Sequence, residues 1–448
     1  MNLKDKKVLI VGLGKTGFAT ARFLVKMGAR VTVTDRREGA VIEGIDSLEE
    51  MGVTVECGGH HMETFLGSDL IVVSPGVPYE LRHLREARDG GVETMSEIEL
   101  ASSFIDIPIV AVTGTNGKTT TTTLLGEIFA AAGRDVFVGG NIGTPLVEYL
   151  LSGRRGSAII LEVSSFQLEG IKRFRPRVAI LLNVTEDHLD RYASIDEYCE
   201  AKFRIFENQK ESDLAIVNGD DPMIMSRIGA VKKPPTVVPF SLTRSSRSGI
   251  FFREGEIIYA GEEGEERYPT GKFKLKGRHN LENIMAAIGA ARHLGISRET
   301  ILKTVERFDG LPHRMEAVRR IGGVWYYNDS KGTNVGALLK SLEGVEGPVI
   351  LIAGGKDKGG NYSLLKDAAA EKVKLLILLG EAKTKIRGAI GTVAETVLAG
   401  SLEEAVRIAS ARCTPGDTVL LSPACSSFDM FKSFEDRGEQ FKRLVHQL

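Results

Sequence analysis

A glycine-flanked lysine and a run of threonines follow an apolar segment in residues 111–123, AVTGTNGKTTTTT. In such a turn, backbone N–H groups cradle phosphate oxygens, a lysine reaches the β- and γ-phosphates and a threonine hydroxyl binds Mg²⁺. The predicted phosphate loop comprises Gly114, Thr115, Asn116, Gly117, Lys118, Thr119 and Thr120. Val112 stands where the strict motif has its leading glycine. The order of strand, turn and helix still favours a nucleoside triphosphate site over an ordinary glycine turn.

Two further groups that could serve a metal-bound phosphate follow apolar segments. Glu162 ends IILE, and His188 follows RVAILLNVTED. Both fall at the carboxyl ends of predicted strands, where open α/β sheets bind ligands. A carboxylate and an imidazole, together with the Thr119 hydroxyl, can bind Mg²⁺. Asp187 and Asp190 are equally available acids, and any of these residues could be purely structural, so composition does not choose among them.

Lys202 lies on the apolar stripe of a predicted helix. A capping box formed by Ser194 and Glu197 starts this helix, and Lys202 follows Ile195 by seven residues. Two interpretations stay open at this point. Either the stem covers apolar surface and the ammonium reaches solvent, or burial favours a neutral amine. A neutral amine can take up CO₂ to give a carbamate, which is an oxygen ligand for a metal.

A second glycine motif, VGLGKTG, stands near the start of the chain. Gly12, Gly14 and Gly17 follow a predicted strand and open a helix, and Asp35 ends the next strand. Such glycines allow close approach of a pyrophosphate, and the carboxylate can bind ribose hydroxyls. Alone, the motif indicates an NAD-dependent oxidoreductase, or glycines that only allow a strand and a helix to pack closely. A dehydrogenase, however, has no use for the separate phosphate loop.

The elements around these motifs predict an α/β protein. Its 448 residues are too many for one compact core, and apolar runs alternate with helical patterns in three series. We predict a Rossmann-like N-terminal domain over 1–106 and a P-loop ATPase-like central domain over 107–312. A Rossmann-like C-terminal domain is predicted over 313–448. Within the central domain, residues 236–268 look like a β-ribbon.

Composition limits the partners that the protein can have. With 42% hydrophobic and 26% charged residues and a net charge of −1, the chain is typical of a globular protein that binds no nucleic acid. No apolar run approaches the ~18 residues that a membrane span needs. The four cysteines are widely spaced, and the charged start is no secretory signal. We therefore expect a cytoplasmic protein, away from the membrane.

Together, the motifs resemble one family across essentially the whole chain, the ATP-dependent amide ligases that build the peptidoglycan stem peptide. The resemblance rests on GTNGKT, EVSSFQLE, NVTEDHLDRY, AKFRIFEN, GRHNLENIMAA, GLPHR and NDSKGTN, in this order. Folylpolyglutamate synthases share the central loop and the HN element but lack a first domain with GLGKTG. Within the family, GLGKTG, SPGVP, NDSKGTN and SPACSSFDMFKSFEDRG resemble the members that add D-glutamate.

This resemblance implies that the first domain binds the uridine diphosphate of UDP-N-acetylmuramoyl-L-alanine instead of a dinucleotide. The implied contacts are Gly14, Thr16, Asp35 and Arg37 for the UDP group, Asn141 and Ser164 for the muramoyl group, and Lys331, Thr333, Lys358, Ser427 and the backbone of Phe434 for the reacting amino acids. Around ATP they are Asn280 at the adenine, Arg314 at the phosphates and Asp329 at the ribose. GGKDKGG offers both Lys356 and Lys358, and spacing favours Lys358.

The resemblance also implies a set of catalytic residues. Lys118, Glu162, His188 and Lys202 form it, with two Mg²⁺ ions held by Thr119, Glu162, His188 and carbamylated Lys202. In the implied reaction, the L-alanyl carboxylate attacks the γ-phosphorus of ATP, and the amine of D-glutamate then attacks the acyl phosphate. Because water must be excluded, we expect the third domain to close over the second.

Two alternatives to the ligase remain, a kinase or simple ATPase and a non-catalytic UDP-sugar sensor. A kinase or ATPase would turn over ATP without the amine, whereas a sensor would bind ligand without turnover. The set of Lys118, Glu162, His188 and Lys202 argues against the sensor. We expect a monomer.

Overall fold

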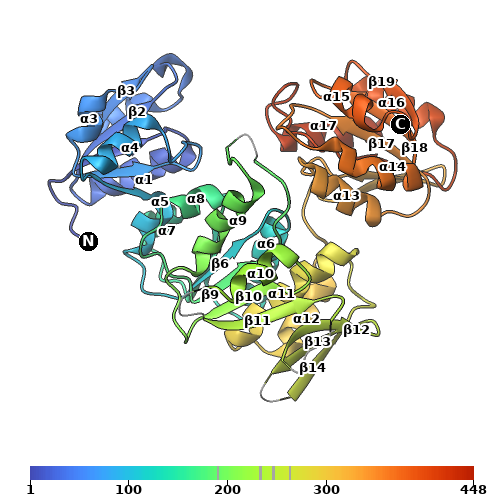
Figure 1. Ribbon diagram of the computed structural model, residues 1–448, viewed down its shortest axis with the longest axis horizontal. Helices are drawn as coiled ribbons and strands as arrows, with labels where there is room; N and C mark the ends of the chain where they lie inside the picture. Colours follow the sequence, from blue (N-terminus) through green and yellow to red (C-terminus); the bar gives the residue numbers. More distant parts are fainter. Residues whose placement is uncertain (189–190, 232–234, 245–247, 262–263) are drawn as a thin grey trace. The chain divides into compact units, whose positions relative to one another are not determined.

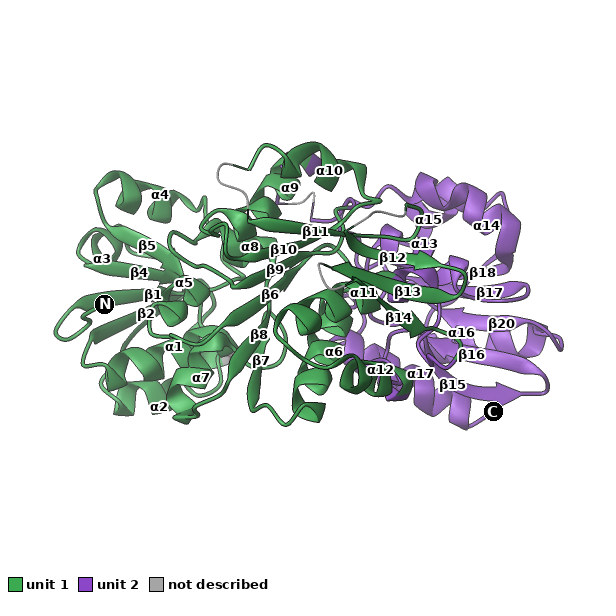
Figure 2. Ribbon diagram, turned by 90° about the horizontal axis from the view of Figure 1, so that it is seen from below, with its two compact units in different colours: residues 1–184, 196–271, 282–306 green, residues 185–195, 272–281, 307–448 purple. Residues whose placement is uncertain are grey.

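The computed structural model describes residues 1–188, 191–231, 235–244, 248–261 and 264–448 (Figure 1). Asp190, one of the acids considered above, lies outside the described residues. The chain forms two compact units, coloured separately in Figure 2. Unit 1 contains residues 1–184, 196–271 and 282–306, and unit 2 contains residues 185–195, 272–281 and 307–448.

The first 102 residues of unit 1 alternate strands and helices around a parallel five-stranded sheet in the order β3-β2-β1-β4-β5. The elements are β1 (Lys7–Val11), α1 (Lys15–Lys26), β2 (Arg30–Asp35), α2 (Ile45–Glu50), β3 (Thr54–Cys57), α3 (Met62–Leu66), β4 (Leu70–Val73), α4 (Arg82–Asp89), β5 (Glu93–Ser96) and α5 (Glu97–Ser102). Strands β1 and β4 are almost fully buried because helices cover a parallel sheet on both faces. The order reverses direction beside β1, so the end of β1 is the switch point where such sheets bind ligands.

A nine-stranded sheet in the order β14-β13-β12-β11-β10-β9-β6-β8-β7 forms the rest of unit 1. Its strands are β6 (Ile109–Thr113), β7 (Val136–Gly140), β8 (Ala158–Glu162), β9 (Val178–Leu181), β10 (Leu214–Asn218), β11 (Thr236–Ser241), β12 (Gly249–Arg253), β13 (Glu256–Gly261) and β14 (Gly264–Pro269). The helices of this region of the chain are α6 (Lys118–Ala131), α7 (Leu146–Ser152), α8 (Ser165–Glu169), α9 (Ile195–Phe203), α10 (Pro222–Ile228), α11 (Arg278–His293) and α12 (Arg298–Arg307). In this order, all neighbouring strands from β12 to β7, including β6, pair in parallel, whereas β12, β13 and β14 pair antiparallel.

Unit 2 is built on a six-stranded sheet in the order β15-β16-β20-β17-β18-β19, parallel except for β15. Its elements are β15 (Glu316–Ile321), β16 (Val324–Asn328), α13 (Val335–Glu343), β17 (Val349–Gly354), α14 (Lys366–Lys372), β18 (Val373–Leu379), α15 (Lys383–Ile390), β19 (Glu395–Leu398), α16 (Leu402–Arg412), β20 (Thr418–Leu421) and α17 (Phe434–His446). Two apolar clusters pack on this sheet, one beneath α13, α14 and α15 and the other beneath α16 and α17.

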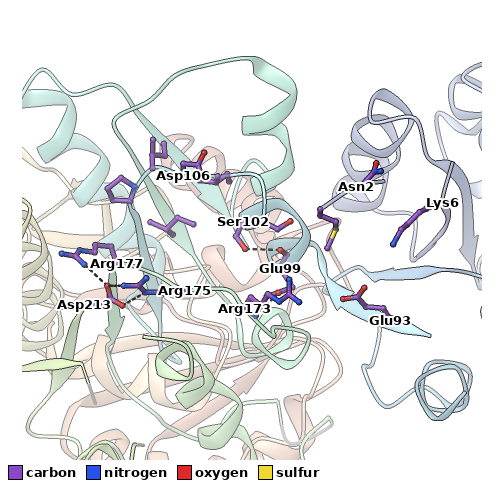
Figure 3. A pocket seen from close by; sticks show the side chains of 16 residues that line it. Asn2, Lys6, Glu93, Glu99, Ser102, Asp106, Arg173, Arg175, Arg177 and Asp213 are labelled. Carbon is purple, nitrogen blue, oxygen red and sulfur yellow. Dashed lines mark hydrogen bonds and ion pairs between the residues drawn. The ribbon is translucent and has the colours of Figure 1, made fainter. Parts of the chain in front are cut away.

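Within unit 1, two buried carboxylates of α5 hold the N-terminal sheet to the central one. Glu97 accepts a hydrogen bond from the Val147 N–H at 2.7 Å, at the start of α7. Glu99 accepts the backbone N–H groups of residues 172–174 at 2.8 to 3.0 Å. Figure 3 shows the adjoining hollow of about 830 Å³, where Asp213 pairs with Arg175 and Arg177. The Glu99 and Asp213 carboxylates in this hollow are therefore already bonded within the protein.

The architecture confirms the predicted fold class of three α/β domains. The segment NLENIMAAIGAARH lies in α11. The predicted ribbon over 236–268 is partly wrong, because β11 and β12 continue the parallel sheet and only β12 to β14 are antiparallel. The boundaries near 106 and 312 stay predictions. Among the described residues, no helix combines the length and the apolar character that crossing a bilayer requires.

Candidate active site

The phosphate loop connects β6 to α6 in unit 1. Gly117 has φ +87° just before α6, and a Cβ there would lie 2.1 Å from Oδ1 of Asn283, so only glycine fits. Nζ of Lys118 donates to the carbonyls of Gly114 at 2.8 Å and Thr115 at 2.9 Å. The lysine therefore curls over the loop that its own helix follows, which is the arrangement needed to meet bound phosphates.

Asn183, which follows β9, holds the other side of this loop. Its carbonyl accepts the Thr115 N–H at 2.9 Å, and its side chain accepts the Asn116 N–H at 2.9 Å and donates to the Asn116 carbonyl at 3.1 Å. Sequence reasoning missed this residue. Its position directly after a buried strand, at the same sheet edge as Glu162, is the signal that could have found it.

Lys202 is buried, with 1% of its surface exposed. Its Nζ donates to the Gly114 carbonyl at 3.0 Å and lies 4.2 Å from the centre of the Tyr198 ring. Because Lys118 donates to the same carbonyl, the two amines converge on one side of the phosphate loop. The interpretation in which the ammonium reaches solvent is wrong, and α9 begins at Ile195 as the capping box predicted.

Glu162 ends β8 with 2% of its surface exposed. Oε1 accepts a hydrogen bond from Nδ2 of Asn141 at 2.9 Å, whereas Oε2 is buried and has no hydrogen-bond partner. A buried carboxylate oxygen without a partner costs free energy unless a cation or a donor binds it. The side chain therefore fits a Mg²⁺ ligand, since Mg²⁺ is bound by one or two carboxylates plus phosphates and water.

The described part of the chain brings together no group of three histidine, cysteine, aspartate or glutamate side chains that could hold a metal by themselves. Thr119 is at the start of α6, one residue after Lys118, and Asn141 orients Glu162. In unit 1, the phosphate loop is therefore surrounded by four of the predicted residues. Lys118 and Thr119 begin α6 directly after the loop, Glu162 ends β8, and Lys202 lies on α9.

The VGLGKTG loop follows β1 in the N-terminal sheet. A Cβ on Gly17 would lie 2.2 Å from the Gly12 carbonyl, whereas a Cβ on Gly14 would meet no atom within 4 Å. The start of α1 therefore packs tightly against the Gly12 backbone at Gly17 and has open space beside Gly14, as pyrophosphate binding requires. Lys15 of the loop donates to the Gly143 carbonyl, and Thr16 lies in the first turn of α1.

Asp35 and Arg37 are joined beside that loop. The carboxylate accepts the Leu13 N–H at 2.7 Å and both Nε and Nη2 of Arg37 at 2.9 Å. The Arg37 guanidinium, with these backbone bonds, holds the pKa of Asp35 well below its usual range against the effect of burial. The pair fixes the end of β2 against the glycine loop, and its oxygens are already engaged before any ribose binds.

Ser164 has a local structural role. It caps α8 in a capping box: its hydroxyl accepts the Gln167 N–H at 3.3 Å, and its own N–H donates to Oε1 of Gln167 at 3.0 Å. The expected contact of Ser164 with the muramoyl group stays a prediction. Asn141, the other residue predicted for this group, follows β7 and bonds Glu162.

Unit 2 contains a cavity of about 240 Å³ that brings several predicted residues together. His188, Thr333 and Lys358 line it, and Lys356 does not. Lys356 instead forms an isolated β-bridge with Ser426 and is exposed. The choice of Lys358 over Lys356 as a contact of the amino acid stays a prediction. Asp187 next to His188 accepts a hydrogen bond from Nδ2 of Asn334 at 2.9 Å.

Asp329 and Asn280 are buried in unit 2. Oδ2 of Asp329 accepts hydrogen bonds from Ser341 and Ser422, both at 2.7 Å. Burial nevertheless raises the pKa of Asp329, although these bonds and the nearby Arg314 charge lower it. Asn280 donates to the Lys276 carbonyl at 2.7 Å at the start of α11.

Lys331 and Phe434 lie side by side, with Nζ of Lys331 4.9 Å from the Phe434 ring centre. Ser427 is buried in the loop after β20. Arg437, which sequence reasoning missed, donates to the Ser330 hydroxyl at 2.9 Å and the Ser330 carbonyl at 2.7 Å. It is 2% exposed, and burial lowers its pKa to about 10. Arg437 lies within SPACSSFDMFKSFEDRG, four residues before the buried Phe441 of α17, and this place on the apolar stripe is the signal that could have found it.

Family models match three successive segments of the chain. They are the MurD-like N-terminal domain of Mur ligases at residues 6–96, the Mur ligase middle domain at 112–291 and the Mur ligase glutamate ligase domain at 313–425. The chain belongs to the Mur ligase family, whose enzymes depend on ATP.

Curated relatives match over the full length. The UDP-N-acetylmuramoylalanine–D-glutamate ligase of Geotalea uraniireducens is 52% identical over 100% of this chain and 99% of its own. The enzymes of the same name from Geotalea daltonii and Koribacter versatilis are 53% and 45% identical, each over 100% of this chain and 99% of its own.

Solved structures share the fold at low identity. A pseudomurein peptide ligase type C from Methanothermus fervidus superposes with a TM-score of 0.65 at 20% identity, covering 99% of this chain and 100% of its own. The MurF ligase from Thermotoga maritima, in complex with ADP, gives a TM-score of 0.62 at 17% identity and covers 99% and 96%.

Proposed function

We propose that the protein is the ATP-dependent ligase that joins UDP-N-acetylmuramoyl-L-alanine to D-glutamate through an acyl phosphate, in cytoplasmic peptidoglycan precursor synthesis. The observation that carries this proposal is full-length identity of about one half to enzymes of that name. The geometry of unit 1 supports it, because two lysine amines and a buried carboxylate surround a phosphate loop.

The first step activates the carboxylate, which is a poor acylating agent at neutral pH. Its oxygen attacks the γ-phosphorus of ATP, the bond from that phosphorus to the β,γ-bridging oxygen breaks, and ADP leaves. Two anions must approach each other, so the main task of the protein is to position them and to neutralise charge. Lys118 and Arg314 provide cations for this step.

Two Mg²⁺ ions, when bound, would neutralise the triphosphate and the attacking carboxylate. Thr119, Glu162, His188 and Lys202 would hold them, and Glu162 has the unpaired buried oxygen that such a ligand needs. As an ammonium, Lys202 has no lone pair for a cation, and a neutral amine is a poor ligand for Mg²⁺, which prefers oxygen. Reaction of its neutral Nζ with CO₂ forms an N–C bond and releases a proton, and the resulting carbamate offers oxygen ligands instead.

The second step forms the amide. The D-glutamate amine attacks the acyl carbonyl, and the tetrahedral intermediate expels inorganic phosphate as the amine loses its proton. The UDP-sugar would be bound by Gly14, Thr16, Asp35, Arg37, Asn141 and Ser164. ATP would be bound by the loop residues Gly114 to Thr120 together with Asn280, Arg314 and Asp329. The amino acid would be bound by Lys331, Thr333, Lys358, Ser427 and Phe434.

An amino acid panel tests the proposal. Phosphate release is measured with ATP, Mg²⁺ and UDP-N-acetylmuramoyl-L-alanine while the amino acid is varied. We expect release that requires both the UDP-sugar and D-glutamate, with L-glutamate and the small amino acids inactive. Release without any amino acid would instead identify an ATPase or a kinase, and saturable UDP-sugar binding without release would identify a sensor.

We further propose that the enzyme acts as a monomer in the cytoplasm, without membrane association. A monomeric ligase suits this reaction because each chain carries all the predicted contacts to its three substrates. Sedimentation velocity across a range of protein concentrations measures this state. A species at twice the chain mass of 48.7 kDa would overturn the monomer.

A further inference from the structure

Three neighbouring loops of unit 2 carry the residues proposed to bind the amino acid. They follow β16, β20 and β17, which are adjacent and parallel in the sheet, so the loops emerge at one edge. Lys331 and Thr333 lie in the first, Ser427 in the second and Lys358 in the third. The relative position of the loops therefore sets the geometry of the amino-acid site.

Backbone hydrogen bonds join the middle loop to both of its neighbours. The Ala424 N–H donates to the Gly332 carbonyl at 2.9 Å. On the other side, Lys356 and Ser426 exchange two backbone bonds of 2.9 and 3.2 Å. These bonds fix the third loop as far as Lys356, but the next residues, which carry Lys358, leave the ladder and turn away.

A side-chain network takes over at that point. The hydroxyl of Tyr362 donates to Oδ1 of Asp357 at 2.8 Å and lies 3.0 Å from Sγ of Cys425 in the middle loop. Asp357 also accepts the Gly359 N–H at 3.0 Å and Nζ of Lys385 at 2.7 Å. Lys358 thus lies in a short turn whose two ends, Asp357 and Tyr362, are bonded to each other.

The tyrosine and the cysteine of this network are buried. Tyr362 is 2% exposed and Cys425 is 1% exposed, and the Tyr362 ring lines the same cavity as Lys358. Burial and the bonds to Cys425 and Asp357 raise the pKa of Tyr362, so the phenol stays a neutral donor. The Lys385 ion pair helps keep Asp357 ionised, and the pKa of Asp357 is lowered although burial opposes this.

We propose that Tyr362 is a positioning residue for Lys358: by bonding Asp357 and Cys425 at once, its hydroxyl holds the Lys358 turn in register with the Ser427 loop and thereby sets the affinity for the amino-acid substrate. The inference rests on the proposed function, in which Lys358 meets D-glutamate. Tyr362 itself takes no part in either chemical step.

Tyr362→Phe removes the hydroxyl and keeps the ring. Loss of one or two hydrogen bonds predicts a KM for D-glutamate raised by roughly 3- to 10-fold. The kcat and the KM for ATP should stay within about two-fold, because the phosphate loop lies outside this network. Asp357→Ala should reproduce the effect, whereas Asp357→Asn, which keeps the acceptor oxygen for Tyr362 and Gly359, should restore most of the affinity.

Tyr326→Phe is the matched control. Tyr326 is 1% exposed in the same unit, and its hydroxyl lies 3.7 Å from Sγ of Cys413, but it packs in the other apolar cluster of the sheet. Its substitution should leave the KM for D-glutamate unchanged. An equal KM change in both tyrosine variants would overturn the inference, as would an unchanged KM in Tyr362→Phe.

The two proposals fail in different ways. If the wild-type chain releases no phosphate with the UDP-sugar, ATP and D-glutamate, the proposed function is wrong. If the wild type turns over and Tyr362→Phe lowers kcat and melting temperature without a selective rise in the KM for D-glutamate, only the positioning role is wrong.

Discussion

Lys202 shows how much a single residue can depend on its surroundings. It is buried against Tyr198 and bonds a carbonyl of the phosphate loop, so its amine faces the site and not solvent. A lysine kept in such a place is costly unless it serves the chemistry. The sequence placed it on the apolar stripe of a helix but could not distinguish burial from an extended stem, because both conformations fit the same spacing.

Lys202→Ala should lower kcat on the order of 100-fold, as loss of a metal-binding group does. Acetate or formate should restore part of the activity by supplying carboxylate oxygens in the space left by the side chain. Steady-state kinetics with and without these acids measures both effects. Independently, ¹³C NMR of the wild type under ¹³CO₂ should show a carbamate signal that the variant lacks, and its absence in active enzyme would contradict the modification.

At the scale of elements, the turn between β6 and α6 is the part that the sequence described best. Glycines, lysine and threonines in a fixed order determine a phosphate loop locally, so no distant contact was needed to predict it. Asn183, which bonds that turn, and Asn283, which lies against Gly117, come from other elements, and these contacts appear only in the folded structure.

Gly117→Ala tests that turn. The new Cβ would be strained at φ +87° and would meet the Asn283 side chain, so turnover should fall by at least about 10-fold and the free energy of unfolding by about 1–2 kcal/mol. Gly133→Ala is the control, since φ is +72° there and no atom lies within 4 Å. Kinetics and urea unfolding should show a stability loss in both variants, larger in Gly117→Ala because its Cβ also meets Asn283, and an activity loss in Gly117→Ala alone.

The link between α5 and α7 gives a pH-dependent prediction. Glu97 is buried, its Oε2 has no hydrogen-bond partner, and burial raises its pKa to about 7 from an ordinary 4.5. An acid whose folded pKa is raised is destabilising when ionised, so its cost is absent below pH 4.5 and complete above pH 7.

Glu97→Gln, which keeps an acceptor for the Val147 N–H, should therefore be close to neutral at pH 5. At pH 8 it should stabilise the protein by on the order of 1–3 kcal/mol. Urea unfolding across this range gives the difference. Exposed Glu93→Gln should show no such trend, and a pH-independent difference for Glu97→Gln would contradict the prediction.

At the scale of the molecule, the sequence predicted three α/β domains because apolar runs and helical patterns alternate in three series. The sequence did not show that β11 and β12 extend the parallel sheet, because a short strand rich in β-branched residues has the same sequence pattern in a ribbon and in a sheet. The contact of Tyr362 with Cys425 could not be predicted, because the two residues lie 63 positions apart in the sequence.

The acyl phosphate makes a prediction for the whole chain. Since water would hydrolyse this intermediate, ATP and the UDP-sugar together should draw the C-terminal domain over the central one. Small-angle scattering with a non-hydrolysable ATP analogue and the UDP-sugar should give a smaller radius of gyration than the free protein. Superimposable curves would contradict closure.

The order of strands in unit 1 has a consequence for how the protein behaves in a crowded cell. The nine-stranded sheet ends at β14, whose sequence GEERYP places Glu265, Glu266 and Arg267 along the border strand and a proline at its end. Charged side chains and proline discourage a second chain from adding itself to an open border. The last hairpin of the sheet, β13 and β14, therefore protects this border and disfavours the addition of a strand from another copy.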